Sequence, residues 1–309
     1  MKPVVVGLIL CTIFVASLVG AQGTATLRVA LDTAFTNLVT SGKYATLSGK
    51  YGLNTTKPAC SSPTTYPLAS GLLKTVLDSG SITLCLYMNS TVPFWTSATR
   101  TGFFDDIMKA VFDEWETQYG KRVTPTWFRV GLQFGFFVDM LAAVNEGVCH
   151  VAVETTTVTT ARSQLADFAC PYTTTTSGFL RGPLNATTRT DLTNLAALND
   201  PSVKVGVLVG SVYDSPSGGV SKAQRVMYTS GTSALAGVAN QDVHASLLEA
   251  PHINSWLLTN PCTGCKYYED GKGTQDYGFF VKKSSASTVL SASSLVSLIL
   301  IMLLVVLAV

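Results

Sequence analysis

The sequence carries little charge. Only 13% of its 309 residues are Asp, Glu, Lys or Arg, and the formal net charge is +2. No cluster of Lys and Arg occurs, so nothing favours a nucleic-acid partner. Histidine occurs three times and Cys262–Cys265 is the single CxxC pair, too few donors for a zinc site built from two ligand pairs. No Ser/His/Asp order or phosphate-binding loop stands out. We predict no metal, no cofactor and no catalytic residues.

Two long apolar runs lie at the ends of the chain. Residues 1–22 are predicted to be a signal peptide, because a lysine precedes an apolar stretch and small residues follow it. Residues 295–309 form an apolar tail behind the polar, small-residue stretch 284–294. This layout is typical of the signal for a glycosylphosphatidylinositol (GPI) anchor. The alternative is a C-terminal membrane helix from about Val289 to Val309. The lipid anchor is favoured because the apolar tail itself, about 15 residues long, is short for a span.

Both alternatives place the folded part outside the cell. Loss of the leader removes Cys11 and leaves an even number of cysteines, which suits three disulfides in an oxidising compartment but does not define their pairing. The disulfide candidates are Cys60, Cys85, Cys149, Cys170, Cys262 and Cys265. Glycosylation sequons occur at Asn54, Asn89 and Asn185, which agrees with a eukaryotic surface protein.

Between these ends, apolar spacing predicts alternating helices and strands. Apolar residues recur on one side of a helix over residues 26–40, and Gly42 is placed to end it. Residues 52–79 are expected to be a loop. From Ser81 the stretches "SITLCLYM", "GFFDDIMKAVFDEWETQYG", "RVTPTWFRV", "FVDMLAAVNEG" and "VCHVAVE" alternate strand and helix, as do "SVKVGVLVG", "SALAGVAN", "VHASLLEA" and "YGFFVKK". Such alternation indicates an α/β protein with largely parallel sheets.

One segment is specific enough to carry a family resemblance. "TVTTARSQLADFACPY" contains T-x-T-x-x-R followed by D-F-x-x-P-Y, and "GFFDDI" and "VGVLVGS" occur in matching order. Over residues 81–283 the sequence resembles the type II periplasmic solute-binding proteins, in particular the amino-acid-binding family 3, whose fold ionotropic glutamate receptor ligand-binding domains share. The resemblance implies a two-lobed fold with mixed, largely parallel sheets, a hinge and a ligand cleft.

The resemblance also implies a division of the chain. Lobe 1 would comprise residues 81–177 and lobe 2 residues 178–273, with residues 274–283 returning as a strand to lobe 1. In that family a helix of the type seen at residues 27–52 follows the last strand. Residues 23–80 would therefore hold the final helix of lobe 1, moved to the front of the chain by circular permutation, and a joining loop. The alternative is an unrelated helix or the remnant of a tandem copy.

The first lobe would supply most of the ligand contacts. An amino acid presents a carboxylate and an ammonium on one carbon, so its site needs a guanidinium and an acid. The resemblance implies that Arg162 binds the carboxylate with the help of Thr157. It also implies that Thr155 offers a carbonyl to the ammonium and that Phe94 packs over the ligand.

The second lobe would complete the site. Ser211 and Val212 follow a strand, where N–H groups at the start of a helix could bind the carboxylate. Glu249 matches the acid that pairs with the ammonium. A carboxylate after the apolar run "ASLL" is costly to bury without a cation.

Each of these assignments has a structural alternative. Arg162 could pair with Asp167, and the two threonines could reflect strand propensity alone. Glu249 could be a solvated strand end. Phe94 could belong to the core, which is the favoured interpretation for Trp95.

His150 and His244 stand where the family usually has aspartate. The same substitution at two equivalent positions predicts a shared role in capping the backbone. A pH-sensitive hinge is a weaker alternative, and His252 is expected on the surface.

We therefore predict an extracellular, membrane-anchored binder of an amino acid or related carboxylate, with an unidentified membrane receptor or transporter as partner. A scaffold without a ligand is one alternative. The other is an enzyme like the dehydratases of this fold that act on cyclic carboxylic acids, with Glu154, Glu249 or a histidine as acid or base.

Overall fold

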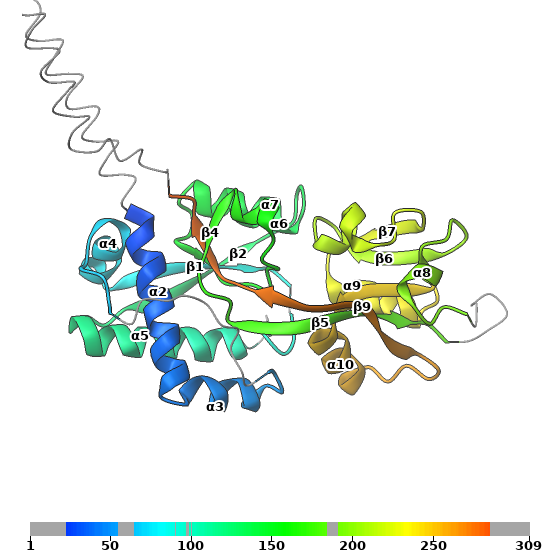
Figure 1. The fold of residues 1–309 in the computed structure, drawn as a ribbon, viewed down its shortest axis with the longest axis horizontal. Coiled ribbons are helices and arrows are strands. Elements are labelled where there is room, and N and C mark those ends of the chain that lie inside the picture. Colours follow the sequence, from blue (N-terminus) through cyan, green and yellow to red (C-terminus); the bar gives the residue numbers. More distant parts are fainter. Residues whose placement is uncertain are drawn as a thin grey trace, which may run out of the picture.

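The computed structural model describes residues 23–54, 65–89, 91–96, 99, 101–183 and 191–284. These residues form two lobes, each built on a five-stranded sheet (Figure 1). The predicted signal peptide, the C-terminal tail, Cys60 and Asn185 lie outside the described residues. Within the described part, no helix combines the length and hydropathy of a membrane span.

The sheet of lobe 1 has the strand order β2-β1-β3-β10-β4. Strand β1 (Ser81–Tyr87) runs parallel to β2 (Thr124–Val130) and β3 (Val151–Ala152). The last strand, β10 (Phe280–Lys282), runs antiparallel between β3 and β4 (Ala166–Phe168). The chain thus returns to lobe 1 at its end, as the sequence predicts.

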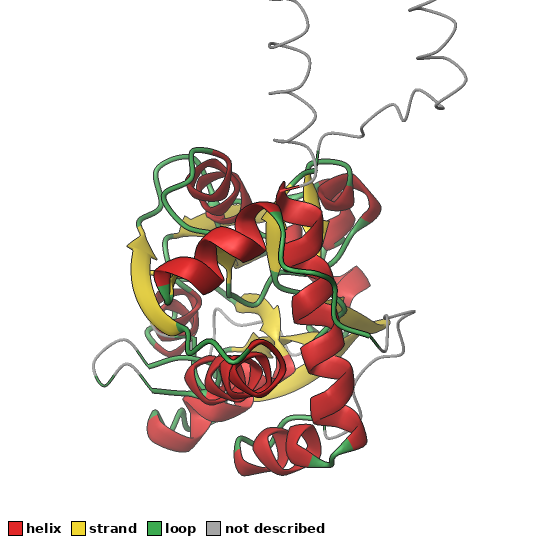
Figure 2. Ribbon diagram, turned by 90° about the vertical axis from the view of Figure 1, so that its left-hand side faces the viewer, coloured by secondary structure: helices red, strands yellow, loops and turns green. Residues whose placement is uncertain are grey.

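Helices cover both faces of this sheet because each presents an apolar stripe to it. On one face, α5 (Phe103–Tyr119) buries Phe104, Ile107 and Val111 beside α2 (Gly23–Thr40) and α4 (Gly71–Ser79). On the other face, α6 (Phe136–Asn145) buries Met140 and Val144. Figure 2 shows the helical side of this lobe.

The leading helix packs beside the last strand. Phe35 of α2 meets Phe279, next to β10, with ring centroids 5.8 Å apart. The indole of Trp115 donates to the carbonyl of Ala30 (3.2 Å), and Cys170 N–H donates to Asp32 Oδ1 (2.6 Å). These contacts place α2 beside the end of the last strand, as the permutation predicts, and the permutation itself stays a prediction. Gly42 follows with a left-handed φ of 78° and separates α2 from α3 (Lys43–Lys50).

Both ends of the described chain lie in lobe 1. Ala25 and Arg28 of α2 line one surface pocket together with Lys283 and Ser284. In Figure 1 the blue start of α2 and the orange end of the described chain lie close together at the upper edge of this lobe.

The sheet of lobe 2 has the order β7-β6-β8-β5-β9. Strand β6 (Lys204–Leu208) runs parallel to β7 (Gln224–Tyr228) and β8 (Ala245–Glu249). Helices α9 (Gly231–Ala239) and α10 (Ala250–Thr259) pack with Leu235, Val238 and Ile253 against one face. A second apolar cluster, which includes Leu198 of the short helix α8 (Leu195–Leu198), covers the other.

Two antiparallel strands connect the lobes. Strand β5 (Thr173–Arg181) leaves lobe 1 and β9 (Lys266–Tyr277) returns to it. Their register shifts between Thr176 and Gly178, where Ser177 Oγ donates to Asp270 Oδ2 (2.6 Å). Strands β5 and β9 therefore form one antiparallel ribbon between the lobes.

Two disulfides join described cysteines. Cys85 of β1 pairs with Cys149, which precedes β3, and Cys262 pairs with Cys265 as a structural bridge, as predicted for the CxxC. Cys170 is also disulfide-bonded.

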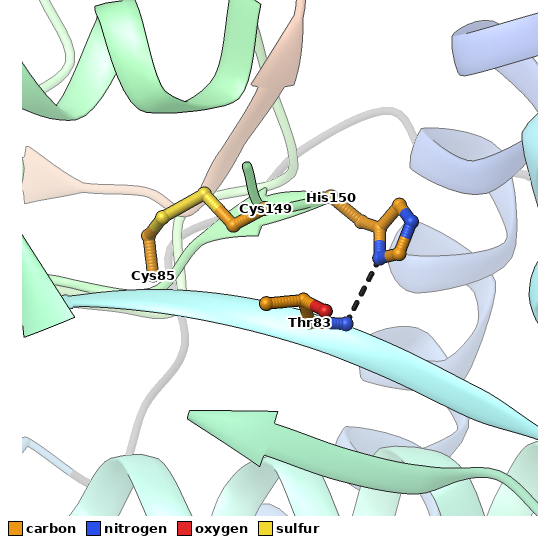
Figure 3. The surroundings of a disulfide bond; sticks show 4 residues. All are labelled: Thr83, Cys85, Cys149 and His150. Carbon is orange, nitrogen blue, oxygen red and sulfur yellow. Dashed lines mark hydrogen bonds between the residues drawn. A yellow bond between two sulfur atoms is a disulfide. The ribbon is translucent and has the colours of Figure 1, made fainter. Parts of the chain in front are cut away.

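The histidine next to the first bridge caps a strand edge. His150 Nδ1 accepts a hydrogen bond from Thr83 N–H (2.9 Å), as Figure 3 shows. In lobe 2, His244 Nδ1 accepts one from Lys204 N–H (2.8 Å). The predicted capping role of both imidazoles is confirmed.

Several elements differ from the expectation. The segment expected to be a loop over residues 52–79 contains α4, whose Leu73 and Val76 are buried. Helix α10 and strand β7 were not predicted. Strand β3 is only two residues long.

Candidate functional site

A small cavity lies between the lobes, and six of the seven predicted ligand-binding residues line it. The residues of this interlobe cavity that the sequence predicted are Thr155, Thr157, Arg162, Ser211, Val212 and Glu249. The first three come from lobe 1 and the others from lobe 2. Their shared position is a structural observation, and their contact with a ligand stays a prediction.

Local structure fixes Arg162 at this cavity. It belongs to the one-turn helix α7 (Thr160–Ser163), where Thr159 Oγ1 accepts the Arg162 N–H (3.2 Å). One terminal nitrogen of the guanidinium donates to the carbonyl of Thr157 (3.1 Å), and the other to Gly210 in lobe 2 (3.5 Å). The guanidinium carbon lies 4.7 Å from the ring centre of Phe137.

These contacts leave donors for a ligand. A guanidinium has five N–H groups, and its hydrogen bonds to other described residues use two of them. Burial lowers the pKa of Arg162 to about 10, so the side chain keeps its charge near neutrality. The alternative pairing with Asp167 is wrong, because Lys283 binds that carboxylate instead (2.8 Å).

Glu249 brings the opposite charge from lobe 2. It ends strand β8, and its Oε1 accepts a hydrogen bond from the hydroxyl of Tyr277 (3.3 Å). Burial raises the pKa of the Glu249 carboxyl, while hydrogen bonding and the charge of Arg162 partly oppose this shift. The solvated strand end is therefore the wrong interpretation. A partly buried carboxylate at a cavity gains from a cation placed there.

A second carboxylate lies behind Thr155. Glu154 is fully buried and accepts hydrogen bonds from Thr155 N–H (2.9 Å), Thr155 Oγ1 (3.2 Å) and Tyr87 N–H (3.1 Å). Burial raises its pKa to about 7. Glu154 does not line the cavity, and its hydrogen bonds hold the chain that carries Thr155.

The turn that contains Ser211 and Val212 differs from the expected anion site. Only a three-residue 3-10 turn, η1 (Val212–Asp214), follows strand β6. The N–H groups of Gly210 and Ser211 donate to Asp214 Oδ2 (3.0 Å) and to the carbonyl of Leu208 (3.1 Å). Lobe 2 itself therefore uses the N–H groups of Gly210 and Ser211.

Phe94 is the one predicted ligand-binding residue outside the cavity. It is 1% exposed and stacks on Phe104 with ring centroids 5.5 Å apart in the core of lobe 1. Its placement over the ligand is therefore a wrong prediction, and the alternative, a core aromatic, holds. Trp95 is fully buried in the same core, as favoured.

His252 lines the cavity although the sequence did not predict it as a site residue. Expected on the surface, it is 4% exposed and lines the cavity from α10. The helical spacing of His252 and Trp256, both buried on α10, is the signal that could have shown this. The other lining residues that the sequence did not predict are Tyr87, Thr91, Phe136, Leu208, Gly231 and Leu248.

Backbone atoms of the two lobes also touch beside the cavity. Phe136 N–H, at the start of α6, donates to the carbonyl of Val209 in lobe 2 (3.1 Å). A Cβ added at Gly210 would lie 2.6 Å from Gly135 Cα, so only glycine allows this approach. Asn89 Nδ2 also crosses the cleft to the carbonyl of Thr229 (3.4 Å), and it donates to Tyr87 as well. The two lobes are therefore in direct contact beside the cavity.

The sequons differ in setting. Asn54 is exposed, which suits glycosylation. Asn89 is half-buried at the cleft, so a glycan there would compete with the contact to lobe 2.

Comparison with known proteins supports the fold. Neither a protein-family model nor a curated protein sequence matches the chain. Among solved structures, the ancestral amino acid-binding protein AncCDT-1, a precursor of cyclohexadienyl dehydratase, gives a TM-score of 0.56 at 19% identity over 68% of this chain and 84% of its own. Arginine-bound ArgBP from T. maritima gives 0.55 at 15% identity, covering 68% and 92%. The GluR0 ligand-binding core with L-glutamate gives 0.53 at 18% identity, covering 74% and 95%.

These likenesses define the class of fold. The chain has the two-lobed type II periplasmic-binding-protein fold, with its site residues from both lobes at the interface.

Proposed function

We propose that this protein captures an amino acid or a related small carboxylate in the interlobe cavity and holds it by closure of the lobes. One observation carries the proposal: Arg162 from lobe 1 and Glu249 from lobe 2 line the same cavity. A zwitterion offers a carboxylate to the guanidinium and an ammonium to the buried acid, so one ligand neutralises both charges. The structural neighbours that are amino-acid-binding proteins support this class of ligand.

Hinge motion of the β5–β9 ribbon would admit the ligand. The lobes meet through the Phe136–Val209 hydrogen bond and the Gly135–Gly210 contact, which we assign to the closed state. In an open state these contacts separate, and a ligand bound to both Arg162 and Glu249 stabilises the closed state because it touches both lobes.

We further propose that the processed chain is displayed outside the cell from a C-terminal lipid anchor. Both ends of the described chain lie in lobe 1. An anchor after residue 284 would thus tether lobe 1 and leave lobe 2 free to move. Transport or signalling would then require a membrane receptor or transporter that senses closure. Release of the protein from cells by a GPI-specific phospholipase would support the lipid anchor, and retention would favour a membrane helix.

An enzyme remains the second candidate, because one structural neighbour is a dehydratase precursor. Catalysis would require an acid or base that faces the cavity. Glu249 and His252 face it, whereas the fully buried Glu154 does not; in the binding role Glu249 pairs with the ligand ammonium. Product release from prephenate or arogenate by the purified protein would overturn that role.

Ligand-dependent thermal stabilisation tests the proposal. A ligand at 100 times its dissociation constant stabilises the folded state by about 2.7 kcal/mol. We expect at least one proteinogenic amino acid to raise the melting temperature of the purified full chain. No response to any of them would favour the scaffold alternative.

A further inference from the structure

Glu154 is a buried acid that the proposed function leaves unused. It is 0% exposed and stands directly before Thr155, which lines the interlobe cavity. No ion pair joins its carboxylate to a cation among the described residues. A buried charge is costly unless hydrogen bonds or an opposite charge compensate it. The question is therefore what balances this carboxylate.

Three neutral donors surround the Glu154 carboxylate. The N–H and the hydroxyl of Thr155 donate to its Oε1 (2.9 and 3.2 Å), and the N–H of Tyr87 donates to its Oε2 (3.1 Å). The two N–H groups can only donate, whereas a hydroxyl can also accept. A protonated Glu154 can therefore keep its contact with Thr155 by donating its own proton to Oγ1. This arrangement accommodates both protonation states of the acid.

The titratable groups packed against Glu154 from lobe 1 supply no positive charge. Tyr87 comes from β1, and the hydroxyl of Tyr172 donates to the backbone carbonyl of Glu154 (3.4 Å). Burial raises the pKa of both phenols, so they are neutral near pH 7. Burial also raises the pKa of the Glu154 carboxyl to about 7. Protonated and ionised Glu154 are thus both present in the ligand-free protein at neutral pH.

The charged residues of the cavity do not compensate Glu154 either. Glu249 of lobe 2 is a second acid, and its charge further disfavours the carboxylate form of Glu154. The guanidinium of Arg162, on α7, donates to the carbonyls of Thr157 and Gly210 instead. The missing cation must therefore come from outside the chain.

The ligand ammonium of the proposed function is such a cation. It would lie against Glu249 and the carbonyl of Thr155, one residue from Glu154. A cation close to an acid favours its ionised form. Arrival of the ammonium would therefore displace the proton of Glu154 into solvent, and the carboxylate left behind would balance the new positive charge.

We propose that Glu154 is a positioning residue that acts through Thr155 and couples recognition of the ligand ammonium to the release of a proton. Ionised Glu154 accepts both the N–H and the hydroxyl of Thr155 and so fixes this residue at the cavity. Binding of amine-bearing ligands then strengthens as pH rises toward neutrality, and binding of plain carboxylic acids does not. This inference rests on the proposed function, because the ammonium must bind beside Thr155.

Titration calorimetry of the full chain at pH 7 in phosphate and in imidazole buffer tests the inference. The ionisation enthalpies of the two buffers differ, so the difference in observed heat counts the protons released. The probes are L-arginine, L-glutamine and L-glutamate, which structural neighbours bind, each paired with its analogue that lacks the α-amino group. The other proteinogenic amino acids follow if none of the three binds.

We expect Glu154 to release about 0.4 proton per amino acid bound, which corresponds to a fall of its pKa by about one unit. The same fall makes amino-acid affinity about tenfold higher at pH 8 than at pH 5 through Glu154 alone. The analogues without an amino group should release no proton from Glu154.

Glu154→Gln assigns the proton to this side chain. The variant keeps the size of the side chain and cannot ionise, so the proton count should fall by about 0.4 and the affinity should rise less with pH. Any proton released from Glu249 is common to both proteins, so the difference between them reports on Glu154. Glu154→Ala also removes the acid and serves if the glutamine variant does not fold.

Asp32→Asn is the matched control. Asp32 is a buried lobe 1 carboxylate, 1% exposed, that pairs with Arg28 and accepts the N–H of Cys170 away from the cavity. Its replacement should leave the proton count at the value of the parent.

Three results would overturn the role of Glu154 and leave the proposed function intact. They are binding of an amino acid without proton release, an equal proton count in the parent and the Glu154 variants, and equal release by amino acids and their analogues. Failure of every proteinogenic amino acid to bind would instead refute the proposed function itself.

Discussion

Replacement of Gly210 by alanine tests whether lobe closure depends on the backbone contact beside the cavity. Gly210 has a φ of 71°, which costs about 1–2 kcal/mol for a residue with a Cβ. The added Cβ would also lie 2.6 Å from both Gly135 Cα and Phe136 N. The lobes must then move apart at this point, and the hydrogen bond from Phe136 to Val209 is lost at about 1 kcal/mol.

The two effects can be separated by a control. Gly147, also in the left-handed region with a φ of 75°, has no atom within 4 Å of an added Cβ. Gly147→Ala should therefore lower the free energy of unfolding by about 1–2 kcal/mol without affecting closure. Gly210→Ala should lose similar stability and, in addition, bind its ligand about 5- to 30-fold more weakly, which corresponds to about 1–2 kcal/mol.

Chemical denaturation gives the stability of both variants, and titration calorimetry gives their ligand affinity. Equal affinity in the Gly210→Ala and Gly147→Ala proteins would refute the closure argument, because the strain is shared and only the interlobe contact differs.

Further predictions concern the charge of Glu249, the pH dependence of binding and the capping role of His150. Glu249→Gln should weaken the binding of amino acids about 10- to 100-fold but change the affinity for plain carboxylic acids only a few-fold, because only the ligand ammonium needs the Glu249 carboxylate. Equal losses of affinity for both classes in calorimetry would reject the pairing of Glu249 with the ammonium. Since burial raises the pKa of Glu249, its charge is lost as pH falls, so wild-type affinity should decrease from pH 8 to pH 4 and the glutamine variant should show a flatter profile. His150→Ala should cost about 1–3 kcal/mol of stability, because Thr83 N–H loses its acceptor, whereas His150→Asp should retain most of it. Burial lowers the pKa of His150 in the folded state, so its contribution to the free energy of unfolding is complete above about pH 6.5 and declines as pH falls below that value. Equal melting temperatures of the His150→Ala and His150→Asp proteins at pH 7.5 would contradict the capping role.

Much of the fold could be predicted because its patterns are local. The one-sided apolar stripe of α2 and the runs of β1 and β6 each bury a face that the sequence displays directly. Helix α4 was missed because it is a single short amphipathic segment behind a stretch rich in Thr, Pro and Ser. Strands β5 and β9 were not predicted, because their pairing joins residues 85 to 104 positions apart, which local patterns do not encode.

The candidate site was predictable only where a motif fixes the residue. Arg162 and Glu249 follow motif positions, and the structure brings both to one cavity. Phe94 shows the limit, because an aromatic beside a cleft and one in the core have the same sequence signature until packing decides between them. The turn at Ser211 differs from the expected anion site for another reason. The Asp214 carboxylate accepts a hydrogen bond from the N–H of Gly210, and this contact depends on the exact turn geometry.

The interaction between one guanidinium and a ligand carboxylate is the centre of this account, and Arg162→Ala tests it most directly. Two charge-assisted hydrogen bonds are each worth about 1.5–3 kcal/mol, so calorimetry should show at least a hundredfold loss of affinity while the thermal transition stays cooperative. Arg28→Ala, which removes a guanidinium paired with Asp32 outside the cavity, should bind like the parent. Binding by the Arg162→Ala protein within a few-fold of the parent would contradict the account.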